Sequence, residues 1–343
     1  MILVAGLIGG CSVVHDAGTW NDSEHPVAGS GAKGAAGAAA VGATASVSAD
    51  SSAAALAPAY DVTPLLQPAR KYLGVEINGA PTSLSPAEQF ATWVGEKPNL
   101  LGQYVGWGTS FNATAASNAW SYGAMDFVVW EPKSTTMADI AAGHSDAYVT
   151  QFAEAVRALN VPIALSFGHE FNGFWYPWGT TGTTAAQFVA AWQHVHNLFA
   201  AAGATNVIWI WDPNDISSLP DVQLKPYYPG DAYVDWAGVT GYWGQTGPST
   251  YGSLYLPTLR EIRTFTQKPF IIAETAVAAG SRQSQSLTDL FDAVEQHEDI
   301  IGFVWYDYNE GGDWRIENRS SLLTQFRSEL SAGDFGFSVS GIR

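Results

Sequence analysis

Short runs of apolar residues alternate with amphipathic stretches from about residue 70 onward. Eight of these runs are almost continuous in apolar residues, which is typical of strands buried on both faces of a parallel sheet. They are Tyr72–Asn78, Leu100–Trp107, Ala124–Trp130, Pro162–His169, Val207–Trp211, Trp236–Tyr242, Phe270–Glu274 and Ile301–Tyr306. The regular alternation of strands with helical segments predicts consecutive βα units.

The segments between the runs have the spacing of amphipathic helices. One of them begins at a capping box formed by Thr184 and Gln187 and ends at Gly203. Its apolar residues recur every three or four positions: Phe188, Trp192, Val195 and Phe199. Eight strands that alternate with helices over about 260 residues predict a closed (β/α)8 TIM barrel, a single catalytic domain over residues 70–343. The rival is an open doubly wound sheet, which usually carries a glycine-rich phosphate loop that residues 76–79 do not form.

The amino-terminal part has a different character. Residues 1–11 contain a short apolar run that ends in Gly-Gly-Cys and looks like an export signal with a lipidation site at Cys11. No Lys or Arg precedes the run, so a lipid anchor, an ordinary export signal and neither of these stay open. Residues 12–69 are rich in Ala, Gly and Ser and are expected to be a flexible linker. The domain is therefore expected to be secreted or anchored to the cell envelope.

Composition narrows the classes of ligand. The net charge of −17 argues against nucleic acid as a partner, because binding of phosphates needs a basic face. The 14 Trp residues suit a groove that stacks on sugar rings, although most Trp side chains in any protein belong to the core. The one cysteine lies outside the predicted barrel, so no disulfide is expected there. A monomer without a cofactor is expected.

Two of the predicted strands run directly into carboxylates. The fourth ends at His169 and Glu170, and the seventh ends at Glu274. The carboxyl ends of barrel strands form the active-site face, and an isolated charge there is costly unless it is paired or used. Two facing carboxylates are what glycoside hydrolysis requires, and a separation of about 5–5.5 Å gives retention of configuration. The alternative is a structural ion pair or a pair of hydrogen-bonded buried acids.

The sequence around these acids resembles glycoside hydrolase family 26, which holds β-mannanases, lichenases and some xylanases. Residues 169–179, His-Glu-Phe-Asn-Gly-Phe-Trp-Tyr-Pro-Trp-Gly, resemble the acid/base segment of that family, and residues 268–274 resemble its strand-seven segment. Further similar segments are Trp209–Asn214, Tyr228–Asp231, Val234–Trp236, Gly241–Tyr242 and Asp313–Arg315. They occur in family order and cover roughly residues 72–330.

The resemblance implies roles for individual residues. Glu170 would be the acid/base and Glu274 the nucleophile of a retaining hydrolase. His169 would bond the substrate or orient the nucleophile, and Tyr242 would donate a hydrogen bond to the nucleophile. Two aromatic side chains would line the subsite where the bond breaks and two polar side chains would support it: Trp175, Trp305, Asn172 and Arg315.

One segment departs from the family pattern. Mannanases of the family typically carry a substrate-binding His near the end of strand three, whereas this chain has Trp130, Glu131 and Pro132 there. Glu131 could bond a sugar hydroxyl instead, which leaves β-1,4-mannan and mixed-linkage β-glucan both open as substrates. Several Trp side chains at strand ends could be sugar platforms or core: Trp107, Trp178, Trp243 and Trp314. Glu76, which ends the first strand, could also reach the site.

The sequence therefore predicts a retaining endo-β-glycanase that acts on a β-linked polysaccharide. One alternative is a non-catalytic carbohydrate-binding protein of the cell envelope on a glycosidase-like barrel, because fold alone does not guarantee activity. A second is an intracellular barrel enzyme that acts on a phosphorylated metabolite. No metal site is predicted, since Gly173 occupies the place of the second His in a His-Glu-x-x-His motif.

Overall fold

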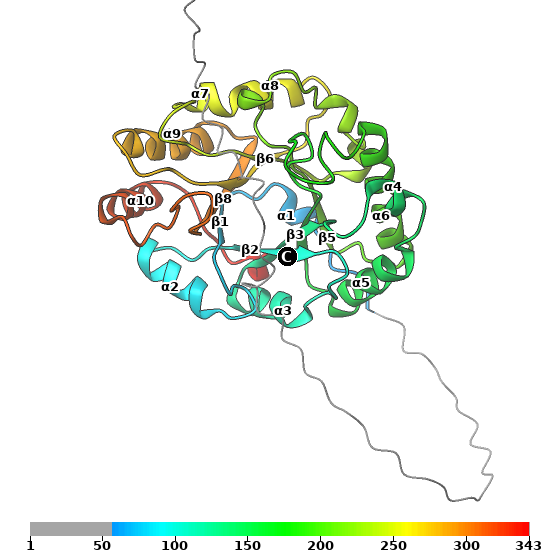
Figure 1. Ribbon diagram of the computed structural model, residues 1–343. Helices are drawn as coiled ribbons and strands as arrows, with labels where there is room; N and C mark the ends of the chain where they lie inside the picture. Colours follow the sequence, from blue (N-terminus) through cyan, green and yellow to red (C-terminus); the bar gives the residue numbers. More distant parts are fainter. Residues whose placement is uncertain (1–56, 343) are drawn as a thin grey trace, which may run out of the picture. The chain divides into compact units, whose positions relative to one another are not determined.

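The computed structural model describes residues 57–342 and confirms the closed barrel. Eight parallel strands pair in chain order, and the last pairs with the first, Tyr72 to Glu76 of β1 lying beside Gly302 to Tyr306 of β8 (Figure 1). The strands are β1 (Tyr72–Glu76), β2 (Leu100–Gly106), β3 (Met125–Glu131), β4 (Ile163–Phe167), β5 (Val207–Trp211), β6 (Trp236–Thr240), β7 (Phe270–Thr275) and β8 (Ile300–Tyr306). Each overlaps one of the predicted runs, although β1, β4 and β6 end two residues earlier than predicted.

All helices but the first form a ring around the barrel (Figure 1). They are α1 (Thr63–Leu66), α2 (Ser85–Val94), α3 (Ala113–Tyr122), α4 (Met137–Ala141), α5 (Asp146–Leu159), α6 (Ala185–Ala201), α7 (Tyr251–Leu254), α8 (Leu256–Ile262), α9 (Gln283–Gln296) and α10 (Ser320–Ala332). Short 3₁₀ turns are η1 (Ile216–Ser218), η2 (Lys225–Tyr227), η3 (Asp231–Tyr233) and η4 (Val339–Gly341). The predicted capping box of Thr184 and Gln187 is present at the start of α6. Within residues 57–342, no helix has both the length and the apolar character needed to cross a bilayer.

The core has two layers because successive strand residues point to opposite faces. One set of side chains fills the barrel interior, and the other packs between the strands and the helices. The interior is so close-packed that a Cβ on Gly74 would lie only 2.6 Å from Val304 Cγ2. Small residues therefore alternate with large ones inside the barrel, as in other filled barrels.

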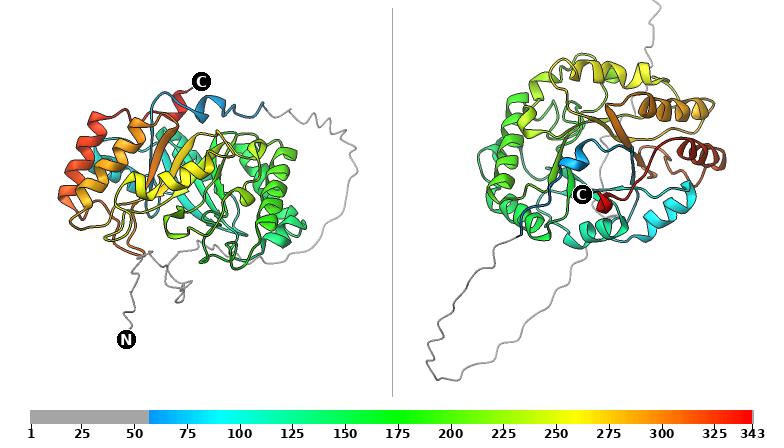
Figure 2. Two further views of the ribbon diagram at one scale, coloured as in Figure 1. Left: turned by 90° about the horizontal axis from the view of Figure 1, so that it is seen from above. Right: turned by 180° about the vertical axis from the view of Figure 1, so that it is seen from behind.

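Residues 59–69 belong to the barrel, so the predicted linker boundary at residue 69 is wrong. Leu65 is fully buried in the interior core cluster, and α1 lies across one end of the barrel near η4 (Figure 2). Tyr72 Oη donates to the Leu65 carbonyl at 2.8 Å, and Trp236 Nε1 donates to the Leu66 carbonyl at 2.9 Å. This segment closes the end of the barrel opposite to the predicted site. The predicted signal segment with Cys11, and residues 12–56 of the predicted linker, lie outside the described residues.

We expect Leu65→Ala to lower the free energy of unfolding by about 2–5 kcal/mol, because it leaves a cavity in a close-packed core. Denaturant titration of the variant against the unchanged protein measures this loss. Thr63→Ala is the matched control, since Thr63 lies in the same helix but is exposed. Equal stability of the two variants would mean that the segment does not contribute to the core.

Candidate active site

The turn after β4 aims Glu170 into the carboxyl-terminal end of the barrel. Gly168 and Glu170 both have positive φ, 61° and 51°, and such a conformation costs a non-glycine residue about 1–3 kcal/mol. The Glu170 amide donates to the Asp212 carbonyl after β5 at 2.7 Å, which fixes the turn against the next strand. Backbone strain of this kind gathers at functional sites, where the surrounding structure holds it in place.

Glu170 is almost fully buried, and both of its oxygens accept hydrogen bonds. Asn214 Nδ2 donates to Oε1 at 2.5 Å, and Trp175 Nε1 donates to Oε2 at 2.8 Å. Burial, and then the charge of Glu274, raise the pKa of Glu170 to about 8, while the two hydrogen bonds oppose that rise. The carboxyl group therefore holds a proton at neutral pH, as a general acid must.

Glu274, at the end of β7, has a different environment. Tyr242 donates a hydrogen bond to its Oε1 and Tyr104 donates one to its Oε2. Burial raises the pKa of Glu274, whereas hydrogen bonds from Tyr104, Tyr242 and Glu76 lower it and so favour the ionised form. Opposed environments for two carboxyl groups whose charges act on each other are the arrangement that separates an acid from a nucleophile.

Asn172 holds the loop that carries Asn214. Its Nδ2 donates to the Asn214 carbonyl and its Oδ1 accepts from the Asn214 amide, both at 2.8 Å. Asn172 is fully buried, so its place is behind the site and not at the sugar. It positions the loop whose Asn214 side chain bonds Glu170.

His169, which precedes Glu170 in the chain, lies within an aromatic group. Its Nε2 lies 3.2 Å from Tyr176 Oη, and its ring centroid lies 6.0 Å from that of Tyr104. Trp178 stacks on Tyr176 with centroids 4.4 Å apart and donates from Nε1 to the His169 carbonyl at 2.7 Å. Because Trp178 is only 1% exposed, it is core, one of the two possibilities that the sequence left open, and it packs against His169 and Tyr176.

The alternation of β8 overturns the expectation for Trp305. This side chain is fully buried in the layer between strands and helices, 5.3 Å from the Phe326 ring of α10. Tyr306, one residue later, points to the opposite face, where its ring lies 5.8 Å from Tyr242. Tyr306 is thus the aromatic side chain that β8 supplies to the site.

Glu131 and Arg315 lie in different surroundings. Glu131, at the end of β3, is buried, and its charge raises the pKa of Glu274. Its Oε2 is 2.9 Å from Lys133 Nζ. Arg315 forms an exposed ion pair with Asp313 at 2.8 Å, and its role in binding substrate stays a prediction. Within residues 57–342, no group of three His, Cys, Asp or Glu side chains could hold a metal ion.

Comparison with known proteins identifies the family to which these features belong. Residues 124–326, which include both carboxylates, match the family described as Glycosyl hydrolase family 26. The chain belongs to glycosyl hydrolase family 26. Endoglucanase H of Acetivibrio thermocellus is 31% identical over 269 residues, which cover 74% of this chain and 30% of that protein. A mannan endo-1,4-beta-mannosidase of Thermothelomyces thermophilus is 28% identical over 173 residues, covering 50% of this chain and 30% of that protein.

Solved family 26 structures share the fold of this chain. The catalytic domain of the endo-beta-1,4-mannanase from Bacillus sp. JAMB-750 has a TM-score of 0.62 at 16% identity, covering 81% of this chain and 90% of that one. A modular endo-beta-1,4-mannanase from Cellulomonas fimi has a TM-score of 0.63 at 18% identity, covering 81% and 75%. At such identities the likeness concerns the fold alone. The chain spans about 30% of the length of the two relatives named above.

Three residues of the family 26 site were not singled out from the sequence. Tyr104 lies within a run that reads as a buried strand, and only its position two residues after Gly102 on the inward face marks it. Asn214 is the last residue of a segment that resembles the family, yet nothing in the motif says that it bonds Glu170. Tyr306 follows the Trp that the resemblance had favoured. A strict count of inward and outward positions along each strand could have found Tyr104 and Tyr306.

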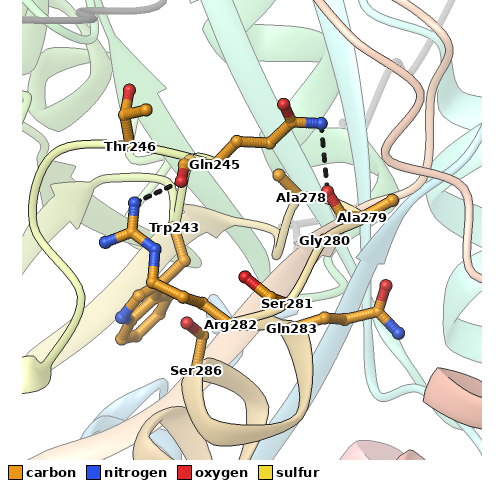
Figure 3. A pocket seen from close by; sticks show the side chains of 11 residues that line it. Trp243, Gln245, Thr246, Ala278, Ala279, Gly280, Ser281, Arg282, Gln283 and Ser286 are labelled. Atoms are coloured by element: carbon orange, nitrogen blue, oxygen red, sulfur yellow. Dashed lines mark hydrogen bonds between the residues drawn. The ribbon is translucent and has the colours of Figure 1, made fainter.

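A cavity of about 300 Å³ lies between the segments that follow β6 and β7 (Figure 3). Hydrogen bonds join the two loops across it. Arg282 Nη1 donates to the Gly247 carbonyl at 3.0 Å, and Gln245 Nε2 donates to the Ala279 carbonyl at 3.0 Å. Trp243, one residue after Tyr242, is fully buried at the cavity wall, so it is core and not an exposed sugar platform.

The hydrogen bond from Trp175 to Glu170 predicts a shift in the pH profile. Trp175→Phe keeps an aromatic ring but removes the donor that favours ionised Glu170, so the pKa of Glu170 should rise further. We expect the basic limb of kcat/KM to move up by about one pH unit. Trp120→Phe, a half-buried Trp in the group that contains Tyr60, is the matched control. A shift toward lower pH would contradict the role of this hydrogen bond.

Proposed function

We propose that this family 26 domain is a retaining endo-β-glycanase in which Glu170 is the acid/base and Glu274 the nucleophile. The observation that carries the proposal is the opposed environment of the two carboxyl groups. Burial and the charge of Glu274 raise the pKa of Glu170, while Glu274 accepts hydrogen bonds from two phenols. Glycoside hydrolysis with retention needs one carboxyl group of each kind.

The same environment supports the change of role between the two steps. In the first step Glu274 attacks the anomeric carbon while Glu170 protonates the departing oxygen, which gives a covalent glycosyl ester. The ester carries no charge, so the repulsion that Glu274 exerts on ionised Glu170 disappears. The pKa of Glu170 should then fall, which lets Glu170 accept a proton from the water that cleaves the ester.

We propose mixed-linkage β-glucan as the preferred substrate and β-1,4-mannan as the second choice. The relative with 31% identity is named an endoglucanase, while a relative with 28% identity over a shorter span is named a mannosidase. Glu131 stands at the end of β3 where mannanases of the family typically carry a His. A carboxylate there would accept a hydrogen bond from a sugar hydroxyl.

A panel of lichenan, mannan and xylan tests the proposal, with products resolved by size and by anomeric form in early NMR spectra. We expect products of mixed length whose new reducing ends first appear as the β-anomer. Products that appear first as the α-anomer would exclude the two-step mechanism. Binding to glycans without any product would favour the non-catalytic alternative.

We also propose that the domain acts outside the cytoplasm. A polymeric substrate cannot enter the cell intact, and the apolar run that ends at Cys11 supports export. Fractionation of cells that make the natural protein, followed by activity measurements on each fraction, tests this. Activity confined to the cytosol would overturn it.

A further inference from the structure

A third carboxyl group, Glu76, lies in the floor of the site and has no part in the mechanism above. It ends β1 and is fully buried. The neighbouring strand makes room for it, because a Cβ on Gly102 would lie only 2.2 Å from Glu76 Cγ. A buried acid that replaces apolar packing in a barrel interior is costly unless it is bonded or neutral.

The hydrogen bonds of Glu76 fit the neutral form. Tyr104 Oη lies 3.1 Å from its Oε2 and also bonds Glu274, and the single phenol proton can serve only one of these two carboxyl groups at a time. No donor among the described residues reaches Oε1 of Glu76, which would leave an ionised oxygen unsatisfied. Glu76 and Glu274 both contact Tyr104 Oη, which brings their carboxyl groups together, and a hydrogen bond between them raises the pKa of Glu76 and lowers that of Glu274. Two carboxyl groups can form that bond only when one of them holds a proton.

The surroundings of Glu76 and Glu274 decide which of the two carboxyl groups holds the proton. Glu274 accepts from the phenols of both Tyr104 and Tyr242, whereas Glu76 has only a longer contact with Tyr104, whose proton is directed to Glu274. Burial, and then the charge of Glu274, raise the pKa of Glu76 well above its ordinary value. The other titratable groups that act on the pair come from several elements: Asp212 after β5, Glu131 of β3, Tyr306 of β8 and Tyr308 beyond it. All of these groups are acids or phenols, so none of them supplies a positive charge that would favour ionised Glu76. The proton therefore stays on Glu76, which is more deeply buried than Glu274.

We propose that Glu76 is a neutral carboxylic acid that donates a hydrogen bond to Glu274 and thereby keeps the nucleophile ionised and in place. It is a positioning residue, because it acts on the reacting sugar through Glu274. The inference rests on the proposed role of Glu274. Its consequence is that the Glu76–Glu274 pair shares one proton and that the nucleophile stays ionised at lower pH than burial alone would allow.

Two substitutions separate this role from the alternatives. Glu76→Gln keeps the shape and offers an amide N–H to Glu274, so we expect the acid limb of kcat/KM to stay within about half a pH unit of that of the unchanged enzyme. Glu76→Leu fills similar space without a donor, so the acid limb should move up by about one pH unit. At a fixed pH below both limbs, that shift is about a tenfold loss.

Other results would overturn the inference. If Glu76→Gln moves the acid limb up as far as Glu76→Leu does, a neutral donor at this place does not keep Glu274 ionised. If Glu76→Leu folds and leaves the acid limb unchanged, no donor to Glu274 has been lost. If Glu76→Leu does not fold, the comparison of Glu76→Gln with the unchanged enzyme still decides, because loss of an ionised neighbour would move the acid limb to lower pH.

An infrared measurement tests the protonation of Glu76 without any substrate. At pH 7 the protein should show carboxylic acid C=O absorption from both Glu170 and Glu76. Glu76→Gln should remove the Glu76 band, which the exposed-site control Glu88→Gln should leave in place. Persistence of the whole band in Glu76→Gln would overturn the inference even if the enzyme is active. Loss of the band in an inactive protein would support the neutral Glu76 and count only against the proposed function.

Discussion

Replacing Glu274 with alanine should reduce hydrolysis of a polysaccharide substrate by about 10⁴- to 10⁶-fold, the scale on which enzymes lose activity without their nucleophile. The expected cause is specific. Glu274 is held by Tyr104 and Tyr242 at the place from which it would attack, and no neighbouring carboxylate can take over. Glu76 is fully buried beneath it, and Glu170 holds a proton at neutral pH. Initial rates at substrate concentrations well below KM measure the loss directly.

Azide should restore part of the activity of Glu274→Ala by entering the space that the carboxylate leaves. It would attack from the face that Glu274 occupies, so the product should be an α-glycosyl azide. Glu298→Ala is the matched control, since it removes the same charge from an exposed position after α9. If Glu274→Ala folds normally and retains full hydrolysis, Glu274 is not the nucleophile.

The barrel was predictable because each of its strands is buried on both faces and leaves a continuous apolar run. The residues at which β1, β4 and β6 end were less predictable. At the active-site rim the chain leaves the sheet while its residues stay apolar or aromatic, as at Ile77 after β1. Trp305 shows the same weakness, because a continuous apolar run does not reveal which residues face inward. Its neighbour Tyr306 has the inward position.

Contacts between distant residues explain most of what the sequence missed in the site. Asn172 and Asn214 are 42 residues apart, and Tyr104 and Glu274 are 170 apart. Neither pairing has a signature in spacing, since each depends on which strands the closed barrel makes neighbours. The two catalytic candidates were visible for the opposite reason. Each is a charge at the end of an apolar strand, where local sequence alone makes it exceptional.

The boundary of the domain was missed for an energetic reason. Residues 59–69 have no amphipathic repeat long enough to predict a packed element, and α1 has only four residues. Their attachment depends on one buried leucine and on backbone carbonyls that accept from Tyr72 and Trp236. Such acceptors belong to the backbone of any residue type, so composition cannot reveal them.

Replacing Glu170 with alanine should have an effect that depends on the leaving group. A polysaccharide has a poor leaving group that needs protonation, so its hydrolysis should fall by about 10²- to 10⁴-fold. An aryl glycoside with a dinitrophenolate leaving group needs no proton, so formation of its glycosyl-enzyme should be nearly unchanged. Its breakdown would then limit turnover, and azide should accelerate it and yield a β-glycosyl azide. Steady-state rates on the two substrate classes, with and without azide, measure this contrast.

The pH profile gives the same assignment independently. Glu170 must be protonated for the first step and its pKa is raised to about 8, so kcat/KM of the unchanged enzyme should fall as pH rises through about 8. That limb should vanish in Glu170→Ala and persist in Glu154→Ala, which removes an exposed carboxylate from α5. The acid limb, which reports ionisation of Glu274, should remain in both variants. If the basic limb survives in Glu170→Ala, another group protonates the leaving oxygen. The strained turn that presents Glu170 would then have no catalytic purpose.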